Sequence, residues 1–185
     1  MRISAISVAV LVIVLPITVG AADWTTTAGS TVEFTARITG GSFLAKSQKV
    51  SATATSDDGQ TLTRVSVLVD AGSFETGIDL RDEHLRDKYL EASTFREIRF
   101  VADGQSLAVK PGSPFSLRGT LTVKGVSKPV QVEGRFESAS VSEVVASTRF
   151  KVDVTEFGIR RPSFAVVKMD PVVDVAVRLV LRRMR

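Results

Sequence analysis

Residues 115–137 read FSLRGTLTVKGVSKPVQVEGRFE, and their pattern is the strongest indication of the fold class. Apolar or small residues occupy alternate positions on both sides of the Lys124-Gly125 dipeptide, with polar or charged residues between them. A pleated strand sends successive side chains to opposite faces, so the pattern predicts two strands with one apolar face and one solvated face each. Lys124-Gly125 predicts the turn that joins them.

The same two-residue period recurs outward in both directions from this hairpin. It predicts about eight strands, at 32–38, 50–54, 65–69, 98–102, 115–123, 130–136, 146–154 and 173–181. Turn residues separate the strands, as at Asp57-Asp58-Gly59, Asp103-Gly104 and Pro111-Gly112. Short links and one-sided strands indicate an antiparallel sheet. Because no series of helices could cover that sheet, a sandwich or a closed barrel remains, and a barrel of this size can enclose one small ligand.

The inward face of these strands is expected to line one apolar cavity. The residues assigned to that cavity are Phe34, Val67, Val69, Phe74, Phe100, Phe115, Leu117, Leu121, Phe136, Phe150 and Val175. Small residues on the same face, such as Gly119, Gly134 and Ala52, would leave room for a ligand. On this reasoning Gly134→Phe should block the cavity while the fold survives.

One segment, 73–95, lacks the alternation and predicts a short helix after the third strand. Asp79 is a candidate N-cap for a helix over 80–90. Asp82 and Arg86 have the i, i+4 spacing of a helical ion pair. The ragged apolar stripe of this helix predicts that it lies against a barrel mouth rather than through a core.

A second irregular stretch, 157–170, carries Gly158, Pro162 and two aromatic residues that are expected to be exposed, Phe157 and Phe164. Loops of this kind commonly carry function on a rigid scaffold. The two irregular segments are therefore candidate lids or portals of the cavity.

Catalytic and metal chemistry find little support in the composition. The chain has no cysteine and one histidine, His84, which excludes thiolate and multi-histidine metal sites and cysteine nucleophiles. No nucleophile motif accompanies His84, so we interpret it as a structural or orienting residue. The net charge is +4, and basic residues alternate with acidic ones along the strands. We therefore predict no enzyme, no cofactor, no metal and no nucleic-acid partner.

Residues 1–21 have the pattern of a signal peptide. Met1-Arg2 is a positive start, 5–14 is an apolar run, and Val19-Gly20-Ala21 has the small residues that a signal peptidase accepts. We expect cleavage after Ala21, which leaves 22–185 as one exported domain without a stable membrane span. An uncleaved membrane anchor is the alternative.

Several motifs resemble those of the YceI-like (polyisoprenoid-binding) family. Ser73-Phe74-Glu75-Thr76-Gly77 followed by Arg81-Asp82-Glu83-His84-Leu85 is similar to its Ser-x-x-Thr-Gly and Arg-Asp-x-His-Leu signature. The stretch 119–130, GTLTVKGVSKPV, is similar to its central hairpin. Lys151-Val152-Asp153 with Phe157-Gly158-Ile159 is similar to the end of a late strand. The leader pattern and the length of the chain agree with the family as well.

The resemblance implies a lipocalin-like antiparallel barrel in the periplasm that holds a long isoprenoid or fatty-acyl or amide chain. Its role would be transport, storage or a stress response, and a homodimer is left open. The signature residues would have structural or gating roles, namely Thr76, Gly77, Arg81, Asp82, His84 and Leu85. The alternative is a barrel filled by its own side chains, which would serve as a structural or protein-interaction module of the cell envelope.

Overall fold

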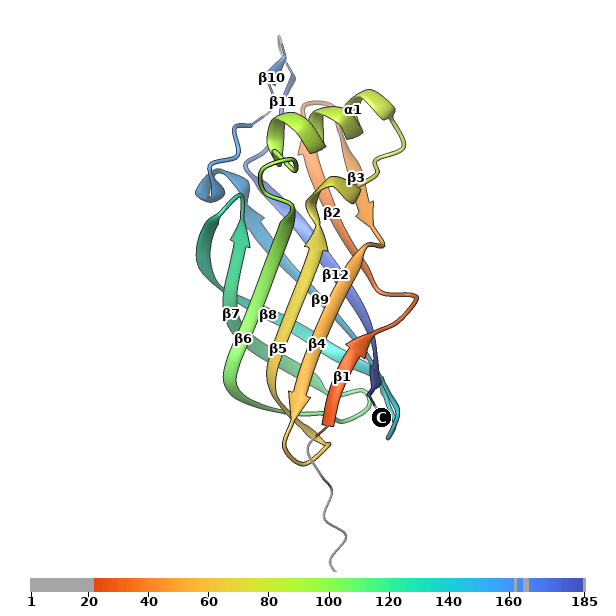
Figure 1. Cartoon of the computed structure of the whole chain (residues 1–185). Coiled ribbons are helices and arrows are strands. Elements are labelled where there is room, and N and C mark those ends of the chain that lie inside the picture. The colour runs from red at the N-terminus through yellow and green to blue at the C-terminus, as the bar shows by residue number, and fades with distance from the viewer. Residues whose placement is uncertain (1–21, 162, 165–166, 185) are drawn as a thin grey trace, which may run out of the picture.

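The computed structural model describes residues 22–161, 163–164 and 167–184, and Figure 1 shows a barrel that is elongated along one axis. The expected signal peptide lies outside the described residues. The strands are β1 (Ala22–Thr26), β2 (Thr31–Ile38), β3 (Gly41–Ser47), β4 (Val50–Ser56), β5 (Thr61–Asp70), β6 (Glu97–Ala108), β7 (Pro114–Val123), β8 (Val126–Ala139), β9 (Glu143–Asp153), β10 (Ser163–Phe164), β11 (Val167–Lys168) and β12 (Val172–Arg183). The helical elements are η1 (Ala71–Ser73), α1 (Asp79–His84), η2 (Leu85–Tyr89) and η3 (Val154–Phe157).

Eight strands close the antiparallel barrel, in the order β1-β4-β5-β6-β7-β8-β9-β12, and β12 pairs back with β1. β2 pairs with an earlier stretch of β12, and β3 pairs with β2. The predicted eight-stranded antiparallel barrel with one short α-helix is confirmed. Among the described residues, none of the helical elements has the length and hydropathy of a membrane-spanning helix.

Four strands and one bulge depart from the expectation. β10 and β11 lie in the stretch 157–170, which was expected to be irregular. β1 and β3 were not predicted, because ADWTT and GSFLAKS show little of the alternation that marks the other strands. Asp103-Gly104 is not a turn between strands, since β6 continues through it. Arg64 of β5 pairs with Asp103 while Leu62 pairs with Leu107, so the extra residues form a bulge in β6.

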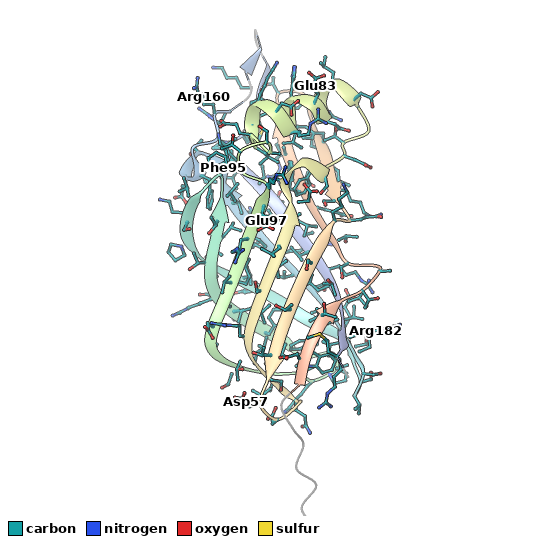
Figure 2. All side chains as sticks on the ribbon, viewed as in Figure 1. Asp57, Glu83, Phe95, Glu97, Arg160 and Arg182 are labelled. Atoms are coloured by element: carbon teal, nitrogen blue, oxygen red, sulfur yellow. The ribbon has the colours of Figure 1, made fainter. Side chains whose placement is uncertain are left out.

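The two ends of the barrel differ. Figure 1 places α1 and the β10–β11 hairpin at one end, which we call the α1 end. Figure 2 shows Glu83 and Arg160 at this end and Asp57 at the opposite end. The described parts of the two irregular segments therefore lie at the same end of the barrel.

The interior is divided into two layers. At the end opposite α1, the barrel is filled by a cluster that we call the plug, which comprises Trp24, Ala52, Ala54, Leu62, Val65, Ala102, Leu117, Val132, Phe136, Val144 and Leu181. Trp24 is only 2% exposed, and its Nε1 has no hydrogen-bond partner among the described residues. The inward orientation predicted from the alternation is correct here, since Leu117 is buried and its neighbour Arg118 is exposed.

The plug corrects the expectation of one cavity along the whole barrel. Leu117 and Phe136 are buried within the plug, and Phe115 packs against it with its ring 4.9 Å from that of Phe136. These three residues therefore fill the interior instead of lining a cavity. The reason is side-chain volume, because the rings of Phe115 and Phe136 meet at this level of a barrel whose interior is just wide enough for side chains.

The inward glycines do not leave room either. A β-carbon on Gly119 would lie 2.5 Å from Cζ of Phe100, and one on Gly134 would collide with the Phe115 ring and the carbonyl oxygen of Ser147. Each glycine is thus covered by a phenyl ring from the neighbouring strand. The expectation that Gly134→Phe spares the fold is wrong, because the position has no space for even a methyl group.

We predict that Gly134→Ala lowers the free energy of unfolding by about 1–3 kcal/mol, the usual cost of overpacking a filled core. Gly41→Ala is the matched control, because a β-carbon at Gly41 meets no atom within 4 Å. Its effect should stay within about 0.5 kcal/mol. Urea unfolding followed by circular dichroism measures both variants. Equal stability of the two variants would contradict the packing of Phe115 on Gly134.

Candidate functional site

A cavity of about 450 Å³ occupies the interior at the α1 end of the barrel. Its wall is apolar apart from Arg81, His84 and Tyr89, which are the ionisable residues that line it within the described part of the chain. Phe34, Phe100 and Phe150 face inward and are nevertheless only partly buried. Their remaining exposure is toward the cavity, whereas the inward residues of the plug are covered on all sides.

Most of the residues assigned from the sequence lie around this cavity. The structure places eight of them in its wall: Phe34, Val67, Val69, Phe74, Phe100, Leu121, Phe150 and Val175. The other three, Phe115, Leu117 and Phe136, belong to the plug layer described above. The sequence period fixes which face a residue occupies, but it carries no information about the height at which the interior is filled.

Sequence reasoning missed part of the wall. Phe43 of β3 lines the cavity, and its ring lies 6.4 Å from that of Phe34. In β3, Phe43 and Ala45 occupy alternate positions, as inward residues of a strand do. The pattern is hard to recognise because the residue between them, Leu44, is also apolar although it is exposed. Phe157 was expected to be exposed, but it is 2% exposed and lines the cavity. Phe157 follows the end of β9 in η3, where the strand alternation no longer applies.

The cavity opens beneath the helical segment. Ile78 and Leu80 line the cavity and are 53% and 61% exposed, so they lie at its rim. Large apolar side chains with such exposure are uncommon in this protein, and here they border the opening. The mouth therefore presents an apolar edge to solvent.

The helical segment starts differently from the sequence-based expectation. α1 comprises six residues, from Asp79 to His84, and continues into the single π-helical turn η2. Asp79 is the first residue of α1 rather than its N-cap, and no side chain caps this helix. The predicted pair of Asp82 with Arg86 does not form.

Arg86 pairs instead with its neighbour Asp87. The guanidinium donates hydrogen bonds of 2.9 and 3.0 Å to the two carboxylate oxygens. These hydrogen bonds lower the pKa of Asp87 below its usual value and raise the pKa of Arg86. Neither residue lines the cavity.

Asp82 holds the loop before α1. Its Oδ1 accepts a hydrogen bond of 2.8 Å from the backbone N–H of Thr76 and a second one from the Thr76 hydroxyl. Gly77 follows with φ of +79°, a conformation that side chains rarely adopt. The Ser-x-x-Thr-Gly and Arg-Asp motifs are thus joined by a hydrogen-bonded turn.

Arg81 is oriented at the mouth by three contacts. Its Nε donates to Thr76 Oγ1 over 2.8 Å, and one terminal nitrogen donates to the Thr76 carbonyl oxygen over 3.1 Å. Its Cζ lies 4.5 Å from the centre of the Phe43 ring, a cation–π geometry. The guanidinium therefore has a defined position on the wall of the cavity.

His84 contacts a lysine rather than a nucleophile or an acid. Lys88 Nζ lies 2.8 Å from His84 Nε2, and because an ammonium group only donates, Nε2 is the acceptor. Among the described residues, no three His, Asp or Glu side chains are arranged to hold a metal ion. The arrangement provides a polar edge to an apolar cavity.

Two further contacts attach the helical region to the barrel. Lys46 of β3 and Glu75 exchange backbone hydrogen bonds of 2.9 Å. Lys124, in the β7–β8 turn, donates to Glu91 over 2.6 Å, and its side chain is only 13% exposed. The segment over the mouth is therefore fastened on both sides of the opening.

A closed antiparallel barrel with an apolar cavity that opens beneath a short helix defines a lipocalin-like fold. The chain belongs to the YceI-like domain family, whose model matches residues 24–181. A UPF0312 protein of Yersinia pestis (strain Pestoides F) is 36% identical over 75 residues, which are 40% of this chain and 37% of that protein. The chain thus matches about two fifths of the length of this curated relative.

Two solved structures share the fold at low sequence identity. A polyisoprenoid binding domain from Saccharophagus degradans, implicated in plant cell wall breakdown, has a TM-score of 0.72 at 15% identity and covers 87% of this chain and 98% of its own. BcnA of Burkholderia cenocepacia has a TM-score of 0.66 at 18% identity and covers 82% and 95%, respectively.

We predict that Asp82→Ala destabilises the protein, because the Thr76 N–H loses its carboxylate acceptor in a partly buried turn. A loss of about 1 kcal/mol corresponds to a fall in Tm of roughly 2–4 °C. The control is Asp79→Ala, which removes another first-turn carboxylate that caps nothing. Thermal unfolding followed by circular dichroism compares the two variants. If Asp79→Ala lowers Tm as much as Asp82→Ala does, the assigned role of the Thr76 contact is wrong.

Proposed function

We propose that this protein binds one long apolar chain, isoprenoid or acyl, in the cavity beneath α1 and performs no catalysis. The observation that carries the proposal is the cavity itself, about 450 Å³ in size and almost wholly apolar in its wall. Pockets for small ligands have volumes of this order and few polar groups. The single ordered guanidinium at the mouth, that of Arg81, is suited to the polar end of such a ligand.

Burial of the chain supplies the binding energy. Each methylene transferred from water to an apolar wall contributes about 0.8 kcal/mol, so a chain of about fifteen carbons provides roughly 10 kcal/mol before ordering costs. No metal or cofactor is needed for this step. The partner is therefore a long-chain lipid that enters at the rim formed by Ile78 and Leu80.

The relatives support the same ligand class. The structural neighbour from Saccharophagus degradans is described as a polyisoprenoid binding domain. The signal-peptide pattern of residues 1–21 supports a site of action outside the cytoplasm, in the periplasm, as a carrier or store of the lipid. The alternative, a barrel filled by its own side chains, describes only the half of the interior that holds the plug. The cavity in the other half favours a ligand-binding protein.

We predict one-to-one binding of a polyprenyl or fatty-amide ligand in calorimetric titration, with a negative heat-capacity change and little dependence on salt. Val175→Phe should weaken this binding at least about tenfold, because it fills space between Phe34 and Phe150, its partners on adjacent strands.

The matched control is Val126→Phe, the same substitution at an exposed position of the β7–β8 hairpin. It should bind like the unmodified protein. The proposed function would be abandoned if no long-chain lipid bound, or if both variants bound with unchanged affinity.

A further inference from the structure

The cavity ends partway along the barrel. Val67, Phe100 and Phe150 line the cavity and also pack against the plug. They therefore form the layer between the empty and the filled halves of the interior, and we call this layer the floor.

The position of Phe100 in the floor is fixed by its contact with a glycine. Its ring lies so close to Gly119 that a β-carbon there would be 2.5 Å from Cζ and 2.6 Å from Cε2. The ring thus already rests against the backbone of β7. Leu117, Val132 and Phe136 of the plug are 6%, 4% and 1% exposed, so the ring rests on side chains that are themselves covered.

A fixed floor sets a maximum chain length. A chain carbon with its hydrogens occupies roughly the volume of a water molecule in the liquid, about 30 Å³. The cavity volume of about 450 Å³ therefore holds about fifteen such carbons. Any further part of the chain has to pass Ile78 and Leu80 at the rim and remain in water.

Building on the proposed function, we propose that the floor selects chains by length, and that the preferred ligand has a tail of about three isoprene units or an acyl tail of similar length. Phe100 is the specificity-determining residue. A longer chain binds no more tightly, because its additional carbons stay in water once the tail has reached the floor.

The test is a titration series with geraniol, farnesol and geranylgeraniol, whose tails increase by one isoprene unit at each step. From geraniol to farnesol, Kd should fall at least about tenfold, and from farnesol to geranylgeraniol it should change less than about threefold. A fall of about tenfold at both steps would overturn the length limit while leaving the proposed function intact. If none of the three bound, the proposed function would fail and the length limit with it.

The variant Phe100→Ala tests the assigned residue. In this variant Kd should fall again between farnesol and geranylgeraniol, so that geranylgeraniol binds about tenfold more tightly than farnesol. Phe115→Ala is the matched control, since Phe115 covers Gly134 as Phe100 covers Gly119 but lies away from the cavity. Phe115→Ala should keep the unmodified length profile. An unchanged profile in Phe100→Ala, or the same shift in both variants, would show that Phe100 does not set the limit.

A second substitution keeps the proposal testable if Phe100→Ala does not fold, which circular dichroism reveals. Val67→Leu adds a methylene at the level of the floor and should weaken farnesol binding by about fourfold while affecting geraniol less than twofold or so. Equal weakening of both ligands would contradict a floor at this level.

Discussion

The barrel closes because β12 pairs with three other strands. One edge of β12 pairs with β9 from Val172 to Arg182. The other edge pairs first with β2 and then with β1. This pairing closes the sheet, so every second residue of each strand must face an interior that communicates with solvent only at the barrel ends. The inward apolar side chains of the strands then form either a core or a cavity wall.

The balance between side-chain volume and the space inside the barrel determines which of the two they form. Leu117 and Leu121 lie on the inward face of β7 on either side of Gly119, yet the first lies in the plug and the second in the cavity wall. Phenyl rings laid over Gly119 and Gly134 keep the aromatic side chains close to the sheet. β7 thus contributes one side chain to the filled half of the barrel and another to the wall of the cavity.

At the mouth, a small polar arrangement accompanies the apolar wall. Thr76 contacts both Asp82 and Arg81, and Arg81 lies over Phe43. Because each of these groups orders the next, the charge at the mouth is held in one place without being buried. A binding site for an amphiphile needs this combination of an apolar interior and one oriented polar edge.

The strand class, the antiparallel pairing and the inward face can be predicted from the sequence alone, because the two-residue period depends only on local backbone geometry. The sequence also locates the helical segment at 73–95, where that period stops. The folded barrel was needed to show that Phe115, Leu117 and Phe136 fill its interior while Phe34, Phe100 and Phe150 face a cavity. It was also needed to show that Asp82 contacts Thr76 and not Arg86. These outcomes depend on how side chains from strands distant in the sequence meet at one height of the barrel, and no local pattern encodes that volume.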